Sequence, residues 1–171
     1  MLSHNTPEKS ILSEQLQKLT PELSHLPLTE LAKQPSHQHC MLCGESPVLG
    51  LKLRFYAQGD QQVWAYFKST IHQQGYQGIL HGGFLSALLD SSMCQALFHQ
   101  GIEGVTGDMN IRFLQEVKVN SAIVMTGKVV SSRHPLHKVE AALYVDGQLM
   151  VKSHARFMTK GFGKANKANG K

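Results

Sequence analysis

The sequence predicts an α+β domain in which one antiparallel sheet wraps round a single long helix. Two strand-like runs come first, a long apolar segment at helical spacing follows at residues 81–99, and four more strand-like runs come after it. A helix that is apolar over most of its circumference must be buried. The 171 residues suit one domain whose core can form without disulfides or a metal ion.

The elements before the helix are a polar extension and a hairpin. Residues 1–36 contain four prolines, and their apolar residues recur at helical spacing from Ile11 to Leu19, which predicts a short amphipathic helix. Residues 49–57 and 62–69 are rich in strand-forming residues. The four residues between them include Gly59 and Asp60 and indicate a hairpin turn.

After the helix, we expect strands at residues 107–114, 123–131, 138–145 and 149–157. The last two alternate clearly and are joined by Asp146-Gly147, a two-residue turn signal. The side chains expected to face the helix are Val139, Ala141, Leu143, Val145, Leu149, Val151, Ser153, Ala155 and Phe157.

The formal charge of +5 comes mostly from residues 160–171, which hold four lysines and no acidic residue. Without those four, 13 basic residues face 12 acidic ones. We interpret residues 160–171 as a basic disordered tail. A nucleic-acid arm is disfavoured because this stretch has a single aromatic residue for base stacking.

Three cysteines, an odd number, fit a reducing compartment better than a disulfide scaffold. The N-terminus has no apolar run typical of a signal peptide. Nowhere do about 18 apolar residues follow one another, as a membrane span would require. The expectation is a cytoplasmic protein that binds neither membranes nor nucleic acid.

The predicted central helix has two features that packing alone does not require. It begins at His81-Gly82-Gly83, although glycines weaken helices. The unpaired N–H groups at a helix start suit a developing oxyanion. Asp90 follows Gly83 by seven residues, so both lie on one helix face, and its carboxylate sits among apolar neighbours. The alternatives are tight packing for the two glycines and a structural carboxylate for Asp90.

Two longer motifs contain these residues. The run GYQGILHGGFLSALLD at residues 75–90 is similar to the signature of the PaaI-like branch of hotdog-fold acyl-CoA thioesterases, and GVTGDMNIRFL at residues 104–114 resembles the strand that follows it. Residues 40–44 with 49–51 also occur in one subgroup. The resemblance covers roughly residues 37–158, and we set the predicted hotdog domain at 37–159.

The resemblance implies a homodimer joined edge to edge, which pairs further into a tetramer. It implies hydrolysis of an acyl-CoA or aryl-acyl-CoA to acid and CoA, with no cofactor. Asp90 would be the general base or the nucleophile, and the Gly82 or Gly83 N–H would polarise the thioester carbonyl. Thr106 would orient water or the carboxylate, and His81 would shape the helix start.

Substrate contacts are expected in two places. Several family members have an Asn or Gln six residues before the histidine. Here that position is Gly75, with Gln74 and Gln77 close by. In the turn between two late strands, we expect Arg133, His137 and Lys138 to contact the CoA phosphates, with an ordinary solvated turn as an equal alternative.

Two further questions stay open in the sequence. Cys40 and Cys43, near His37 and His39, suggest half of a zinc knuckle, but without a second cysteine pair a tight turn at Gly44 is favoured and no metal is predicted. The alternative function is a non-catalytic acyl-CoA or fatty-acyl binding protein. A hotdog dehydratase is disfavoured because its longer helix motif is absent.

Overall fold

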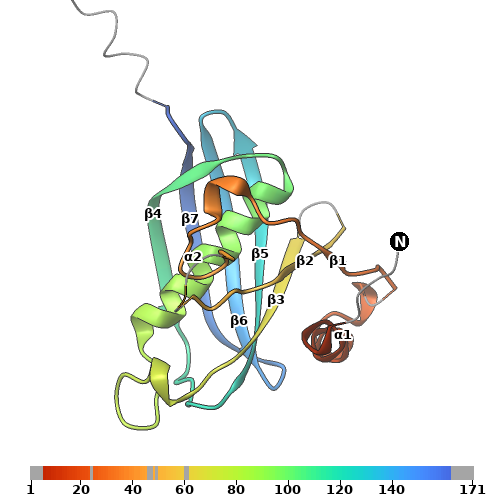
Figure 1. Cartoon of the computed structure of the whole chain (residues 1–171), viewed down its shortest axis with the longest axis vertical. Coiled ribbons are helices and arrows are strands. Elements are labelled where there is room, and N and C mark those ends of the chain that lie inside the picture. The colour runs from red at the N-terminus through yellow and green to blue at the C-terminus, as the bar shows by residue number, and fades with distance from the viewer. Residues whose placement is uncertain (1–5, 24, 46–47, 49, 60–61, 163–171) are drawn as a thin grey trace, which may run out of the picture.

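A computed structural model describes residues 6–162 except 24, 46–47, 49 and 60–61. Its centre is a seven-stranded antiparallel sheet in the order β1-β2-β3-β5-β6-β7-β4, which curves round helix α2, Gly82–His99 (Figure 1). The strands are β1 Thr29–Glu30, β2 Phe55–Gln58, β3 Gln62–Lys68, β4 Gly104–Phe113, β5 Ala122–Arg133, β6 Leu136–Val145 and β7 Gln148–Thr159. The α+β prediction is therefore confirmed. No helix in the described residues is long and apolar enough to cross a membrane.

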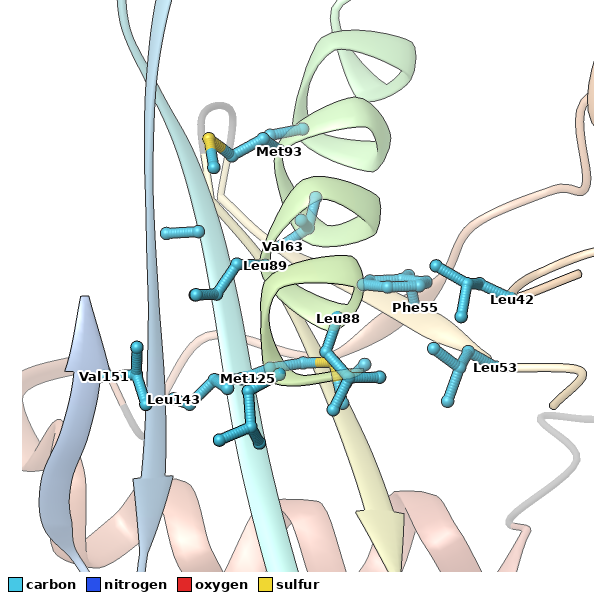
Figure 2. Close-up of a cluster of buried hydrophobic side chains, with 14 of the residues drawn as sticks. Leu42, Leu53, Phe55, Val63, Leu88, Leu89, Met93, Met125, Leu143 and Val151 are labelled. Carbon is cyan, nitrogen blue, oxygen red and sulfur yellow. The ribbon is translucent and has the colours of Figure 1, made fainter. Parts of the chain in front are cut away.

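The core lies between α2 and the sheet. Figure 2 shows Leu88, Leu89 and Met93 projecting from α2 among side chains of the strands, and all three are fully buried. α2 passes so close to β5 that a Cβ added at Gly127 would lie 2.1 Å from the backbone oxygen of Ser92. Only glycine permits this approach, which fixes the position of α2 on the sheet.

The expected alternation holds in the last two strands except at Leu149. Nearly all the predicted inward residues of β6 and β7 are buried, among them Leu143, Val151 and Phe157. The prediction for Leu149 was wrong. A register shift follows Leu143, so that Leu149 pairs with Tyr144 on the outer face and Met150 is buried instead. The bulge inserts one extra residue and reverses the alternation beyond it.

The observed strand boundaries differ from the predicted ones at the N-terminal side of the sheet. The first predicted strand, residues 49–57, is realised only as β2, and the short strand β1 beside it was not predicted. Three 3₁₀ turns complete the structure: η1 Pro21–Leu23, η2 Pro35–His37 and η3 Ile71–Gln73. Most of the predicted basic tail, residues 163–171, lies outside the described residues.

The N-terminal extension is attached to the domain by α1, Pro7–Leu19. Thr6 caps the helix by accepting a hydrogen bond from the Lys9 N–H. The buried Leu12 and Leu16 pack in a second apolar cluster with Tyr56, Trp64 and Val124. The predicted amphipathic helix is confirmed, and its apolar stripe covers part of the sheet.

Strand β4 is the outermost strand on its side of the sheet, and among the described strands it pairs with β7 alone. Along and just beyond it, Val105, Phe113 and Leu114 are 53%, 50% and 44% exposed. Its outer backbone N–H and C=O groups form a ten-residue edge available for pairing with another strand.

Candidate functional site

The start of α2 is capped by its own histidine. His81 has extended backbone angles, and its Nδ1 accepts a hydrogen bond of 2.9 Å from the Gly83 N–H. The next two N–H groups, of Phe84 and Leu85, bond to the His81 carbonyl. No acceptor for the Gly82 N–H is found among the described residues. One of the two predicted oxyanion donors is thus occupied, and Gly82 remains available at the positive end of the helix.

Asp90 lies in the third turn of α2 and is half-buried. The Thr106 hydroxyl donates a 2.6 Å hydrogen bond to its Oδ1. Thr106 pairs across β4 and β7 with Phe157, which is buried beneath α2, so both side chains face the helix. The structure thus brings together the two residues that the sequence assigned to one site.

A bulge in β4 helps to aim Thr106 at the carboxylate. The register with β7 shifts between Thr106 and Asp108, and Gly107 is the extra residue. A Cβ at Gly107 would lie 3.2 Å from the Arg156 oxygen, which favours glycine there. Bulges of this kind redirect neighbouring side chains and are common beside functional sites.

Within one chain, the helix start and the carboxylate are separate. At a rise of about 1.5 Å per residue, Gly82 and Asp90 are about 12 Å apart along α2. Water attacking from Asp90 must reach a carbonyl carbon at about 3–3.5 Å, and an oxyanion donor must lie about 3 Å from the carbonyl oxygen. The N–H groups at a helix start also point away from the rest of the helix, so a carbonyl oxygen bonded to Gly82 would lie beyond the helix start, on the side away from Asp90.

Two hollows meet at the helix start. One of about 360 Å³ is lined by Gly75, Tyr76, Leu80, His81 and Gly82. The other, of about 310 Å³, is mainly apolar and shares Leu80 and Gly82 with it. A larger hollow of about 680 Å³ lies on the outer face of the sheet, and none of the predicted site residues lines it.

Of the glutamines near Gly75, Gln74 stabilises the loop by a hydrogen bond. Gln74 Oε1 accepts a 2.7 Å hydrogen bond from the Gly78 N–H. A Cβ added at Gly75 would lie 3.0 Å from the Cα of His81, so a larger residue would press on the helix cap. Gln77 is exposed and is the amide of this group that stays open to solvent.

The β5–β6 turn separates the three predicted phosphate contacts. Arg133 and Lys138 are exposed and line a hollow of about 410 Å³. His137 is buried, with Nδ1 2.8 Å from the Ser132 hydroxyl and Nε2 2.9 Å from the Thr159 hydroxyl. Burial lowers the pKa of His137. The His137 ring is thus hydrogen-bonded to β5 and β7, and the side chains open to a ligand are those of Arg133 and Lys138.

Within the described part of the chain, one group of side chains could hold a metal ion. His37, Cys40 and Cys43 place their ligand atoms within 4.8 Å of one another. His39, which the sequence had set beside them, is exposed and outside this group. The Cys-x-x-Cys spacing in the sequence indicated the cysteine pair. Only the folded loop shows that His37, and not His39, lies beside these two cysteines.

One family model matches part of the chain. Residues 77–152, which run from just before α2 into β7, match the family model described as Thioesterase superfamily, and this stretch is less than half of the 171 residues. The matched stretch includes His81, Gly82, Asp90 and Thr106.

Curated relatives are similar to this chain over shorter stretches. Acyl-coenzyme A thioesterase 13 of Mus musculus is 38% identical over 55 residues, which is 31% of this chain and 39% of the relative. Acyl-coenzyme A thioesterase THEM4 of Rattus norvegicus is 25% identical over 75 residues, 44% of this chain and 32% of the relative. The chain thus spans about a third of the length of the curated relatives it matches.

Solved structures confirm the hotdog fold. Zebra fish thioesterase superfamily member 2 gives a TM-score of 0.63 at 21% identity, over 72% of this chain and 94% of that one. Escherichia coli PaaI gives 0.60 at 16% identity, over 63% and 83%. A Streptococcus pneumoniae hypothetical thioesterase with coenzyme A gives 0.60 at 21% identity, over 64% and 89%. The expectation of a PaaI-like hotdog fold is confirmed.

The Streptococcus pneumoniae protein has also been solved as two single-residue variants. In one, a threonine is replaced by alanine, and in the other an aspartate is replaced by alanine. In that chain the aspartate precedes the threonine by sixteen residues.

Proposed function

We propose that this protein is an acyl-CoA thioesterase that hydrolyses an acyl-CoA or aryl-acyl-CoA to a free acid and CoA. The observation that carries the proposal is the hydrogen bond from Thr106 to Asp90, a carboxylate half-open to solvent in a mostly apolar helix in which it is the single acidic residue. The two residues are sixteen apart, the same separation as the aspartate and threonine replaced in the Streptococcus pneumoniae protein. That protein binds coenzyme A.

In the proposed reaction, Asp90 is the general base. Thr106 occupies Oδ1, which leaves Oδ2 to take a proton from a water molecule. The water oxygen then bonds to the thioester carbon and forms a tetrahedral oxyanion. When the C–S bond breaks, the CoA sulfur receives the proton from Asp90, and the products are a carboxylic acid and CoA.

We assign the oxyanion contact to Gly82 of the partner subunit. The Gly83 N–H already bonds to His81 Nδ1, whereas the Gly82 N–H has no acceptor among the described residues. A single preorganised donor of this kind contributes about 10²–10³-fold to kcat. His81 then acts as a positioning residue, because its cap fixes the backbone at the helix start.

A partner subunit is favoured by the direction of the helix and by the sheet edge. The Gly82 N–H lies about 12 Å along the helix from Asp90 and points away from it, so the proposed site uses the helix start of a second chain. The unpaired edge of β4 and the exposed Val105 and Phe113 offer the surface for a homodimer. Thr106 belongs to the same strand, which would place the carboxylate pair at the interface.

The experiment that tests the proposal is hydrolysis of a panel of acyl-CoA and aryl-acyl-CoA substrates, followed by release of the CoA thiol. We expect Asp90→Asn to lower kcat by about 10²–10⁴-fold, because it removes the general base while keeping the side-chain shape. Asp146→Asn is the matched control, since Asp146 is an exposed turn residue between β6 and β7.

Thermal unfolding and gel filtration of Asp90→Asn show whether its fold and association are intact. Wild-type turnover in a folded Asp90→Asn variant would refute the role of Asp90. An acyl-CoA that binds the wild type without any hydrolysis across the panel would instead support the non-catalytic binding function.

A further inference from the structure

The loop between β1 and β2 brings a histidine and two cysteines together. The ligand atoms of His37, Cys40 and Cys43 lie within 4.8 Å of one another, and Cys43 is buried. They belong to η2 and the turn after it, the segment drawn in orange that lies alongside α2 in Figure 1. The cluster is outside the Asp90 site, and the proposed hydrolysis does not use it.

The distance between the nitrogen and a sulfur fits a tetrahedral metal site. His37 Nδ1 is 3.6 Å from Cys43 Sγ. Zinc bonds of about 2.3 Å to sulfur and 2.0–2.1 Å to nitrogen at a tetrahedral angle require a separation of about 3.6 Å. A metal ion therefore fits between these two atoms without moving either side chain.

The backbone of the loop is wound tightly round the two cysteines. The Cys40 N–H bonds to the His37 carbonyl at 3.0 Å, and the Gly44 N–H bonds to the Cys40 carbonyl at 2.9 Å. A Cβ at Gly44 would lie 2.6 Å from the backbone oxygens of Cys40 and Gln38. The Cys-x-x-Cys-Gly turn is thus fixed by the fold and holds its sulfurs at one place.

Side chains of α2 support the cluster from the other side. Gln95 Nε2 donates a 3.2 Å hydrogen bond to Cys43 Sγ, and Gln95 is buried. His37 Nε2 faces Cys94 Sγ at 4.0 Å, and the ring meets Phe98 edge-on at 4.7 Å between centroids. A proton on Nε2 directed at Cys94 leaves the Nδ1 lone pair free for a metal ion.

We propose that His37 Nδ1, Cys40 Sγ and Cys43 Sγ bind a zinc ion, with a water molecule as the fourth ligand. The two thiols lose their protons on binding, and their two negative charges balance the charge of the ion. Cys94 lies outside the ligand set and remains a thiol beside Nε2. The ion fixes the η2 loop in the conformation that contacts Gln95 and Cys94 of α2, and this role does not depend on the thioesterase activity.

Metal binding is measured on the full-length reduced protein. We expect one zinc ion per chain by elemental analysis after dialysis, and a cobalt-substituted protein with the intense visible absorption of tetrahedral thiolate coordination. Both signals should be lost in Cys43→Ala and strongly reduced in His37→Ala. Cys94→Ala and His39→Ala are the matched controls, because one is a buried cysteine and the other a nearby exposed histidine, and both should keep one zinc ion per chain.

The cobalt spectrum of the wild type tests the proposal even if a cysteine variant does not fold. A wild-type protein that binds neither zinc nor cobalt at micromolar concentrations would overturn the metal site. Loss of metal in Cys94→Ala with unchanged thermal stability would overturn the ligand set. A purified protein without metal whose mass is lower by two hydrogen atoms, with Cys40 and Cys43 linked in its peptide map, would overturn the metal site in favour of a disulfide.

Discussion

The hydrogen bond between Thr106 and Asp90 gives the sharpest test of how the site works. Its length of 2.6 Å is typical of a hydroxyl donating to a carboxylate. Such charge-assisted bonds contribute about 1.5–3 kcal/mol, and tenfold in rate corresponds to about 1.36 kcal/mol. Thr106→Val, which keeps the shape and removes the hydroxyl, is therefore expected to lower kcat by about 10- to 150-fold.

The size of the kcat loss within that range depends on how far water screens the hydrogen bond. Thr106 is exposed in the single chain, and water screening would place the loss near tenfold. If a partner strand covers β4, as proposed, the bond is shielded and the loss should approach the upper value. KM should change little, because the hydroxyl bonds to Asp90 and makes no required contact with the substrate.

The assay is steady-state release of CoA thiol, and Thr106→Ser is the matched control because it keeps the hydroxyl and should retain most of the activity. In the Asp90→Asn background the same valine substitution should cost less, since the charged acceptor is gone. Equal losses in the serine and valine variants would refute the reasoning, because they would show a packing effect in place of a hydrogen bond.

Two predictions concern stability. Gly127→Ala should lower Tm by several degrees in thermal unfolding, because its Cβ would lie 2.1 Å from a backbone oxygen of α2. Gly82→Ala is the control, and its Tm should stay near that of the wild type because its Cβ would lie 3.5 Å from the Phe113 ring. Equal Tm values in the two variants would contradict the close approach of α2 to β5. Burial lowers the pKa of His137, so as pH falls through about 6.5 the unfolded chain takes up a proton that the folded chain does not, and stability should fall. Tm measured at about pH 8 and pH 6 should therefore change less in His137→Gln than in the wild type, and an identical change in both would contradict this assignment.

Pairing of two subunits through β4 is part of the proposed site. Asp90 and Thr106 are already paired in one chain, but the Gly82 N–H that would complete the reaction is about 12 Å away along the helix. A variant that blocks pairing of β4 should therefore keep its fold and lose turnover, since the second helix start would be missing. Thr106, which bonds to Asp90 of α2, lies on the edge strand β4, so in the proposed dimer association and chemistry would be linked.

The sequence by itself determined the features that depend on near neighbours. The apolar pattern predicted α2, Asp146-Gly147 predicted the turn between β6 and β7, and the spacing placed Asp90 two turns beyond the helix start. These are set by periods of 3.6 and 2 residues and by turn chemistry, which act within a few positions of the chain. The burial of His137 and the outward position of Leu149 did not follow, because the first depends on strand packing and the second on a bulge.

Only the tertiary structure decided which distant residues meet. β4 follows α2 in the chain but lies at the sheet edge beside β7, and this placement brings Thr106 to Asp90. The cysteine loop meets Gln95 of α2 across 52 residues of sequence. Neither contact has a local signal, because each results from packing the whole sheet round one helix, and close packing fixes positions that no short segment can specify alone.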